Sequence, residues 1–266
     1  MPEVDHISFV PCLEKMQPIT LEEMDSVKLM NRIDSKYVLS EATLQRMLTA
    51  AADAGYRVLC TGSSRISPYD SVYFDTDGLT MFYLHHNRRL VRQKVRTRCY
   101  VRSGEAYLEI KRKNNHGRTS KKRIGLPLEQ MNGFSGNEEA CAYLARHSWF
   151  TEPDLAPSLE TAFTRITLVN PSLTERLTID TRLRFKNYRT AYETTLLDTV
   201  VIELKQDGRA RSAMRGIFLE HRIKPVRVSK YCIGITLTDP QAKSGRFKVK
   251  VRAIEKTIGK RLNTIC

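Results

Sequence analysis

The sequence predicts an α+β fold, in which antiparallel strands curl into a β-barrel and helices lie at its periphery, in the connections between strands. Three observations support this fold class. Apolar and polar residues alternate in several stretches of strand length, short polar turns separate them, and helical patterns occur between them. The chain has 266 residues, of which 41% are hydrophobic, so one large core is possible.

The first elements follow from caps and alternation. Thr20 and Glu23 have the spacing of a capping box, which predicts a short helix after Thr20. An alternating strand runs from Asn31 to Leu39, and Ser40 then caps a helix that Gly55 ends. The patterns predict strands at 72–76, 93–102, 106–113 and 121–126, helices at 80–89 and 138–147, a loop at 114–120 and a linker at 152–158.

The second half continues in the same style. It predicts strands at 159–169, 175–185 and 199–205, a helix at 211–221, and a helix or a strand from Ser229 onward. We therefore expect a lead-in with a short helix at 1–28, a main domain at 29–240 and a basic tail at 241–266. The tail is either an amphipathic segment for an anionic membrane or a protein partner, or a solvated helix or loose end. The second interpretation is favoured, because terminal segments are commonly loose.

The charge points to a polyanionic partner. Lys and Arg number 44 against 29 Asp and Glu, which gives a net charge of +15. Nucleic acid, an anionic membrane and phosphorylated small molecules all fit such an excess. Six scattered cysteines without metal spacing, no signal peptide and no apolar run of roughly 18 residues favour a cytoplasmic protein with reduced thiols.

Charged residues occupy one face of each of five predicted strands. Lys94, Arg96 and Arg98 share a face of one strand, since side chains alternate along a strand. The same pattern recurs on the other strands, in Arg32, Asp34 and Lys36, in Glu109, Lys111 and Lys113, in Arg176 and Asp180, and in Glu203 and Lys205. A single strand of this kind is equally compatible with one wet face of a sheet. Five strands share this pattern, and most of them carry one isolated carboxylate among several bases. This favours a barrel whose bore binds a metal-bridged triphosphate.

Seven short motifs carry a family resemblance. They are Arg32-Ile33-Asp34-Ser35-Lys36-Tyr37, Tyr73-Phe74-Asp75-Thr76, Lys94-Val95-Arg96-Thr97-Arg98-Cys99-Tyr100, Leu108-Glu109-Ile110-Lys111-Arg112-Lys113, Arg176-Leu177-Thr178-Ile179-Asp180, Ile202-Glu203-Leu204-Lys205 and Ser229-Lys230-Tyr231. In this order they resemble the VTC domain, the polyphosphate polymerase domain of the vacuolar transporter chaperone. That family belongs to the CYTH or triphosphate tunnel metalloenzyme superfamily. The resemblance spans roughly residues 20 to 235.

The resemblance implies a phosphotransferase that passes the terminal phosphoryl group of ATP to inorganic polyphosphate in a tunnel, with Mn²⁺ or Mg²⁺. It assigns the catalytic phosphate contacts to Lys36, Arg96, Arg98, Lys111, Arg165, Arg176 and Lys230. Further triphosphate contacts would come from Arg32, Lys94, Lys113, Lys121, Arg123 and Lys205, and metal ligands from Glu203 with Asp180, Glu109 or Asp34. Phe163 stands where the family often has Tyr. A stand-alone domain of this kind is typical of bacteria.

Alternatives remain at this point. The site could serve a triphosphatase or polyphosphatase, although few carboxylates favour synthesis over hydrolysis. It could also belong to a non-catalytic polyphosphate-binding protein; nucleic acid is not expected, since RNA-binding signatures are absent. Individual residues have structural interpretations too: Glu203 as an ion-pair partner, Asp75 as a hydrogen-bond anchor, Tyr73 and Tyr100 as packing residues. Arg112 is expected to point away from the bore.

Overall fold

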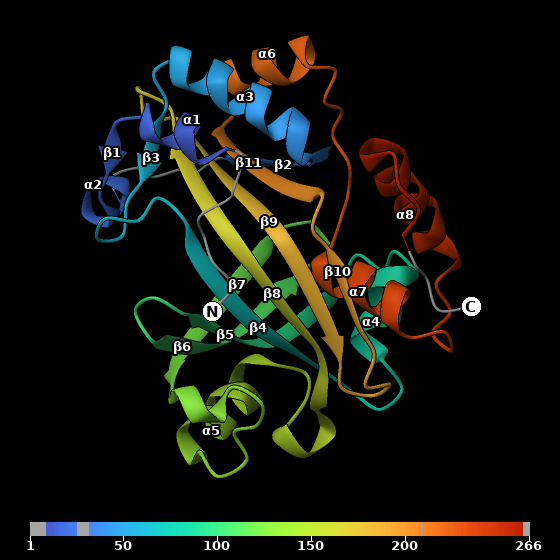
Figure 1. The fold of residues 1–266 in the computed structure, drawn as a ribbon. Coiled ribbons are helices and arrows are strands. Elements are labelled where there is room, and N and C mark those ends of the chain that lie inside the picture. The colour runs from blue at the N-terminus through green and yellow to red at the C-terminus, as the bar shows by residue number, and fades with distance from the viewer. Residues whose placement is uncertain (1–8, 26–31, 209, 263–266) are drawn as a thin grey trace.

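The computed structural model describes residues 9–25, 32–208 and 210–262. Its centre is one sheet of 11 strands, in the order β2-β11-β9-β8-β4-β5-β6-β7, with β1, β3 and β10 attached beside this path (Figure 1). The described pairings are antiparallel except that of β1 with β3. The strands are β1 (Pro18–Ile19), β2 (Arg32–Ser40), β3 (Arg57–Leu59), β4 (Ser67–Asp75), β5 (Arg92–Tyr100), β6 (Glu105–Lys113), β7 (Thr119–Leu126), β8 (Ala156–Val169), β9 (Glu175–Asn187), β10 (Glu193–Leu196) and β11 (Thr199–Asp207).

The sheet is open, so the predicted closed barrel is not confirmed. Within the described residues, β2 pairs along the sheet only with β11, and β7 only with β6. The outer edge of β2 is occupied by the segment before α7. There the backbone N–H of Val226 donates to the carbonyl of Lys36 at 2.7 Å, and Pro225 bridges to Tyr37. This segment lies where a closing strand would pair with the middle of β2, and β7 ends the sheet as a mostly exposed edge strand.

Two irregularities bend the long strands. Between β8 and β9, Ala162 pairs with Arg184 but Thr164 pairs with Thr181, so β9 carries one extra residue. Arg182 lies in this bulge with a φ of 55°. A second shift occurs where β4 pairs with β8. Bulges increase the local twist and bend of a strand, and in Figure 1 β8 and β9 run diagonally while β5, β6 and β7 cross the molecule below them.

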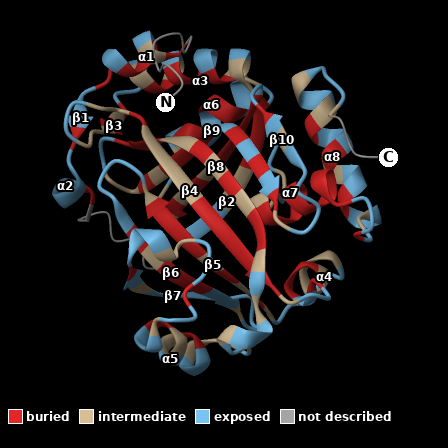
Figure 2. Ribbon diagram, turned by 60° about the horizontal axis from the view of Figure 1, so that its bottom comes forward, coloured by how far each residue is buried: buried red, intermediate tan, exposed pale blue. Residues whose placement is uncertain are grey.

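Helices cover the sheet in three groups (Figures 1 and 2). Helices α1, α3 and α6 lie over one end of it, α4, α7 and α8 lie beside the sheet, and α5 lies at the opposite end from α3. The helices are α1 (Val10–Glu14), α2 (Leu21–Asp25), α3 (Glu41–Asp53), α4 (Thr80–His86), α5 (Glu138–His147), α6 (Ala213–Glu220), α7 (Lys230–Thr238) and α8 (Gly245–Ile258), with 3-10 turns at Leu128–Gln130 and Glu152–Asp154. None of these helices has the length and apolar character that a membrane crossing requires.

Each helix group has its own apolar cluster with the sheet. Leu44 and Met47 of α3 are buried with Ile202 of β11 in the first cluster. The second cluster joins α4, α7 and α8 to β8, β9 and β11, and the third joins α5 to β4, β5 and β6. Because these clusters occupy the other surfaces of the sheet, the face between its two ends is left for polar side chains.

Several local predictions are confirmed. The backbone N–H of Thr20 donates to Glu23 at 2.9 Å and that of Glu23 to Thr20 Oγ1 at 3.2 Å, which completes the capping box before α2. Ser40 caps α3 through the N–H of Thr43, and Gly55 follows that helix with a φ of 76°. The predicted hairpin is β5–β6, and the helix at 138–147 is α5.

Other expectations needed correction. The expected linker at 152–158 contains a 3-10 turn and the start of β8, and the short strands β3 and β10 were not predicted. Residues from Lys230 onward form the helix α7. The favoured interpretation of the tail is a solvated helix or a loose end. Residues 245–258 do form a helix, α8, but it is not fully solvated: Phe247, Val251 and Ile254 are buried in the second cluster, because their spacing gives the helix one apolar face.

Gly234 lets α7 approach β8 and β9 closely. A Cβ at this position would collide with Leu159 and lie 2.8 Å from Phe185 Cδ1. We expect Gly234→Ala to lower the free energy of unfolding by about 1–3 kcal/mol, because overpacking outweighs the better helix propensity of alanine. Urea unfolding followed by circular dichroism measures this. The control is Gly216→Ala in α6, where a Cβ meets nothing within 4 Å and stability should not fall; equal stability of Gly234→Ala and the wild type would contradict the close packing.

Candidate functional site

Charged side chains from both ends of the sheet lie near one another. In the order of the sheet, β6 lies near one end and β2 and β11 at the other. Nevertheless Lys111 of β6 interacts electrostatically with Glu203 of β11 and with Lys36 of β2. The curved sheet therefore brings its two ends face to face. We call the space between them, lined by these side chains, the bore.

Glu109 of β6 holds two bases from the neighbouring strands. Only 2% of its side chain is exposed. Arg96 Nη2 and Nε donate to Oε2 at 2.6 and 2.8 Å, and Lys121 pairs with Oε1. Burial would raise the pKa of Glu109, but Arg96, Arg98 and Lys121 outweigh it and lower the pKa to about 2. The carboxylate is therefore ionised at neutral pH and ties β5, β6 and β7 together.

Asp180 of β9 has the same role in the other half of the bore. Arg165 of β8 donates to both of its oxygens, at 2.6 Å from Nε and 2.8 Å from Nη2, in a fork geometry. Lys230, the first residue of α7, pairs with the same carboxylate. Burial opposes ionisation, but Arg165 and Lys230 hold the pKa of Asp180 well below its usual range. This ion triad fixes the start of α7 against β8 and β9.

Glu203 of β11 is the most accessible of the three carboxylates in the bore. Its Oε1 lies 2.6 Å from Lys36 Nζ, and 22% of its side chain is exposed, against 2% for Glu109 and 5% for Asp180. Burial would raise its pKa, but Lys36, Lys205 and Lys111 lower the pKa to about 2. Glu203 is thus ionised, in contact with water and surrounded by bases.

Three further bases of the bore form no ion pair with a carboxylate within the described parts of the chain. Lys94 Nζ donates to Ser229 Oγ at 2.7 Å. Arg98 Nε donates to Ser71 Oγ at 3.1 Å, although only 7% of Arg98 is exposed. No hydrogen bond or ion pair among the described residues engages the side chain of Lys111. A buried cation without a counter-ion is costly, so Arg98 indicates where an anion would be stabilised. Lys94 is half-buried and Lys111 is exposed, so these two add charge beside it.

Burial and neighbouring charges shift the pKa values of two of these bases. Burial, then the charges of Arg96 and Arg165, lower the pKa of Arg98 to about 10 despite the opposing effect of Glu109. Burial also lowers the pKa of Lys111 to about 8, with Lys94 and Lys36 adding to it and Glu203 opposing it. The Lys111 side chain is nevertheless exposed, so its charge faces solvent within reach of the other bases.

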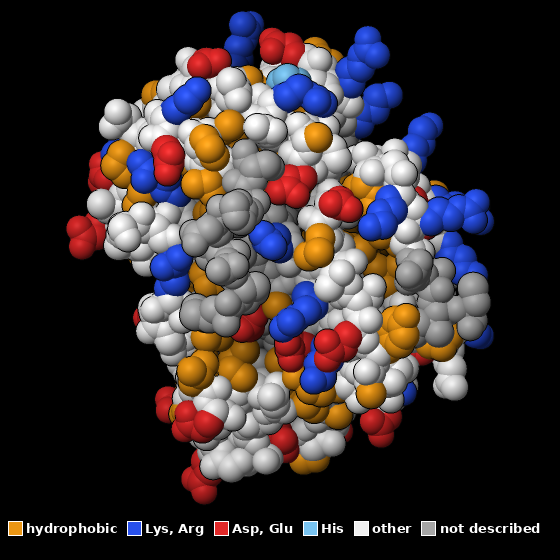
Figure 3. All heavy atoms as spheres, in the orientation of Figure 1, with side chains coloured by type: hydrophobic (Ala, Val, Ile, Leu, Met, Phe, Trp, Pro, Cys, Tyr) orange, Lys and Arg blue, Asp and Glu red, His pale blue; other side chains and the backbone are white. Residues whose placement is uncertain are grey.

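The bore as a whole carries an excess of positive charge. Its bases are Lys36, Lys94, Arg96, Arg98, Lys111, Lys121, Arg165 and Lys230, and its carboxylates are Glu109, Asp180 and Glu203. Eight bases against three carboxylates leave five positive charges in a small volume. Part of the net charge lies elsewhere, since exposed bases line α8 along one edge of Figure 3.

The ring of Phe163 contacts several cations on one side of the bore. The guanidinium of Arg165 lies 5.3 Å, and Lys230 Nζ 4.3 Å, from the centre of the Phe163 ring, with Arg98 at 6.0 Å. Tyr69 stacks on Phe163 at 5.5 Å. The face of Phe163 therefore offers cation–π contacts in place of a hydroxyl. Sequence reasoning did not assign Tyr69, Ser71 or Ser229 to the site, because their partners lie on distant strands.

Asp75 anchors α7 from the side. It accepts hydrogen bonds from the Tyr231 hydroxyl at 2.5 Å and from the backbone N–H groups of Met81 and Phe82 at 2.8 and 2.9 Å. The predicted role of Asp75 as a hydrogen-bond anchor is confirmed. Tyr73 stacks on Tyr231 at 5.0 Å, as expected for a packing residue. These contacts hold the residue before Tyr231, Lys230, at the bore.

The remaining predicted contacts lie toward the ends of the bore. Arg176 and Lys205 are cross-strand neighbours and half-buried. Arg123 lies 4.5 Å over the ring of Tyr107, and Lys113 lies at the last position of β6. Asp34 is exposed, opposite Lys205 in register. The side chain of Arg32 lies outside the described residues.

The predicted metal ligands do not form one centre. The described residues contain no group of three or more His, Cys, Asp or Glu side chains that could hold a metal ion. Glu109, Asp180 and Glu203 are instead paired with different bases. A Mg²⁺ or Mn²⁺ ion that arrives on a phosphate chain needs only one or two protein carboxylates, since phosphate oxygens and water supply the other ligands. Glu203 has the exposure and the ionisation for that role.

The sequence matches the VTC domain family over residues 31–238. The chain belongs to the VTC domain family. The matched segment contains every charged residue of the bore named above, from Lys36 to Lys230. The resemblance inferred from the seven motifs is therefore confirmed.

Solved structures give weaker similarities to this VTC domain. A protein from Bacillus halodurans proposed to be an adenylate cyclase is 15% identical, with a TM-score of 0.48 over 75% of this chain and 96% of its own. A Hippeastrum protein described as having a dominant triphosphatase activity is 14% identical, with a TM-score of 0.47 over 76% of this chain and 94% of its own. Both scores are too low to add to the family assignment. No curated protein matches the chain.

The pKa of Lys111 makes anion binding pH-dependent. Because this pKa is lowered to about 8, Lys111 loses its proton as the pH rises through that value, and the bore loses a charge. We expect the affinity for inorganic tripolyphosphate to fall by about tenfold between about pH 7 and about pH 9. In Lys111→Arg the guanidinium stays charged, so the ratio of its affinity to that of the wild type should rise over this range. Calorimetric titration measures both proteins, and parallel pH profiles would contradict the assignment.

Proposed function

We propose that this VTC domain is a polyphosphate polymerase, which transfers the terminal phosphoryl group of ATP to a polyphosphate chain in the bore. The observation that carries the proposal is Arg98. Only 7% of this residue is exposed, and its guanidinium is charged at neutral pH and has no carboxylate partner among the described residues. Natural cores rarely keep a cation in that state unless a ligand compensates it. Family membership supports phosphate as that ligand.

The arrangement of bases suits a linear phosphate chain. Arg98 offers a fork that matches two phosphate oxygens, while Lys94 and Lys111 act as compact charges. They lie on adjacent strands, with Lys94 directly opposite Lys111. Lys36 and Lys230 add charge from the other side of the bore and remain oriented by Glu203 and Asp180. A chain of phosphates threaded through the bore would meet positive charge on every side.

Phosphoryl transfer asks mainly for positioning and charge compensation. The bases hold the donor and acceptor phosphates in line and compensate the charge that spreads over the transferred group. The acceptor is a terminal phosphate that is already ionised, so no side chain has to remove a proton from it. Glu203 would hold a divalent ion that neutralises part of the charge on the phosphate oxygens.

A triphosphatase is the competing function, and the carboxylates of the bore argue against it. Hydrolysis benefits from a general base that activates water, and such a base works best with a pKa near the working pH. Glu109 and Glu203 have pKa values of about 2, and Asp180 is held far below its usual range. All three already bind bases. The bore is therefore better equipped to bind phosphate than to activate water.

Incubation of the purified protein with ATP and MnCl₂ tests the proposal directly. We expect long-chain polyphosphate and ADP, because a terminal phosphate is the acceptor. Gel electrophoresis of polyphosphate and chromatography of nucleotides measure the products. Release of orthophosphate without chain growth would identify a triphosphatase, and tight polyphosphate binding without turnover would identify a binding protein.

Arg98→Met separates function from folding. Removing a buried, unpaired charge should raise the free energy of unfolding of the ligand-free protein by about 1 kcal/mol. The same change should weaken tripolyphosphate binding by at least about tenfold, since a charge-assisted hydrogen bond is lost. Thermal unfolding and calorimetric titration give the two values. Arg184→Met, at an exposed position of β9, is the control and should change neither; a destabilised Arg98→Met with normal binding would make Arg98 a structural residue.

A further inference from the structure

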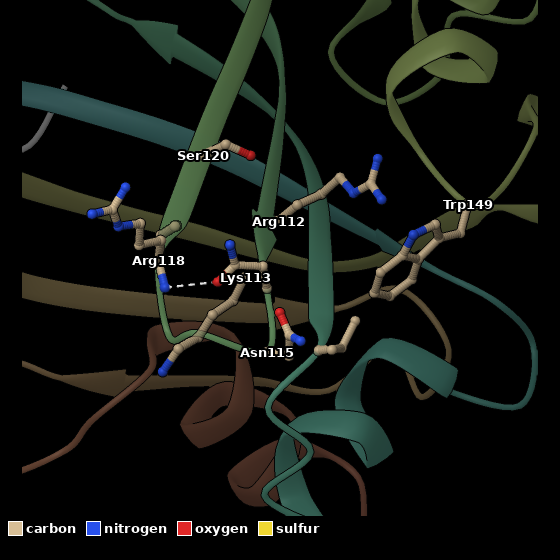
Figure 4. A pocket seen from close by; sticks show the side chains of 9 residues that line it. Arg112, Lys113, Asn115, Arg118, Ser120 and Trp149 are labelled. Carbon is tan, nitrogen blue, oxygen red and sulfur yellow. Dashed lines mark hydrogen bonds between the residues drawn. The ribbon is translucent and has the colours of Figure 1, made fainter.

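A basic groove lies at the tip of the β6–β7 hairpin, outside the bore (Figure 4). One hollow of about 550 Å³ is lined by Val91, Arg112, Lys113, Asn114, Asn115, Arg118, Thr119, Ser120 and Trp149. A second hollow of about 510 Å³ shares Val91 and Asn115 with it and continues along Leu84 and the segment 87–90. The two hollows adjoin, and we call them together the hairpin groove.

The lining of the hairpin groove has one sign of charge. Its charged residues are Arg88, Arg89, Arg112, Lys113 and Arg118, and no Asp or Glu occurs among the described residues that line it. Five bases without a carboxylate attract a polyanion and repel cations. This contrasts with the bore, where carboxylates hold several of the bases in place.

Part of the groove wall is held in place by specific contacts. The Arg112 guanidinium lies 5.3 Å from the Trp149 ring, and Nη1 of Arg112 donates to the carbonyl of His147 at 3.4 Å. The Trp149 backbone N–H donates to Gln93 Oε1 at 3.2 Å. In Figure 4, Arg112 extends toward Trp149, whereas Lys113 and Arg118 extend on the other side of the hairpin tip. The hairpin thus presents bases on both of its sides.

The hairpin groove is continuous with the bore along β6. Lys113 lines the groove and Lys111 lies in the bore. They are two residues apart on one face of the strand, a distance of about 7 Å between Cα atoms. On the neighbouring strand β5, Arg92 lies opposite Lys113 and Lys94 opposite Lys111. A row of bases therefore leads from the bore to the groove.

We propose that the hairpin groove is a second binding site for linear inorganic polyphosphate, which holds the part of the chain that protrudes from the bore. This inference rests on the proposed function. Polyphosphate fits better than RNA, because single-stranded RNA binding relies on free aromatic faces for base stacking. The one aromatic ring of the groove, Trp149, is already stacked by Arg112. The site gives the protein a preference for long chains over tripolyphosphate.

Trp149 is the only tryptophan of the chain, so its fluorescence reports on the groove. Titration with long-chain polyphosphate should change this fluorescence, and titration with tripolyphosphate, which is short enough to stay in the bore, should not. Charge reversal in Arg89→Glu/Arg118→Glu leaves Trp149 and Arg112 in place. It should weaken long-chain binding by about tenfold or more at low salt and leave tripolyphosphate affinity within about twofold. Arg46→Glu/Arg184→Glu, with the same charge change at exposed positions on α3 and β9, should behave as the wild type.

Two results would overturn the inference. One is equal long-chain affinity in the groove variant and the Arg46→Glu/Arg184→Glu control. The other is an RNA oligonucleotide of matched charge that binds more tightly than polyphosphate and depends on Arg89 and Arg118. Failure of the proposed function would give a different result, in which Arg98→Met binds tripolyphosphate normally. If long-chain binding still required Arg89 and Arg118 in that case, the groove would be supported on its own.

Discussion

The structure depends on bringing many positive charges close together between the two ends of the curved sheet. Each of the three carboxylates in the bore neutralises bases from different elements: Glu109 joins β5, β6 and β7, Asp180 joins β8, β9 and α7, and Glu203 joins β2 and β11. The three carboxylates are buried or half-buried, so removing their bases would leave an uncompensated charge inside the protein. The carboxylates therefore hold the fold together, and the cations left over, Lys94, Arg98 and Lys111, are the part of the charge that remains for a ligand.

The apolar architecture makes this arrangement possible. Three separate clusters cover the other surfaces of the sheet, and bulges curve the long strands, so that β6 comes to face β11 and β2. Helix α7 contributes through close contact: Gly234 permits it to lie against Leu159 and Phe185, and Asp75 holds Tyr231. Lys230 and Ser229 therefore reach Asp180 and Lys94 at the start of that helix.

Sequence patterns predicted much of this and missed what depends on distant contacts. Alternation along β5 and β6 placed Lys94, Arg96, Arg98, Glu109 and Lys111 on one face, and caps predicted α2 and α3, since these signals are local. Alternation does not say whether a sheet closes, because that depends on what covers its edge, here Val226 against β2. Alternation also does not predict that the carboxylates expected to bind a metal form ion pairs with bases, or that α8 packs on the core. Both features depend on contacts between elements that are far apart in the chain.

The central claim is that the unpaired cations converge on one phosphate chain. A crystal structure with bound tripolyphosphate and Mn²⁺ tests it most directly. The account predicts phosphate oxygens within hydrogen-bond distance of Arg98, Lys94 and Lys111 together, in a single continuous ligand between β6 and β11. Tripolyphosphate bound only on the outer surface, for example along the exposed bases of α8, with the bore filled by water, would contradict it.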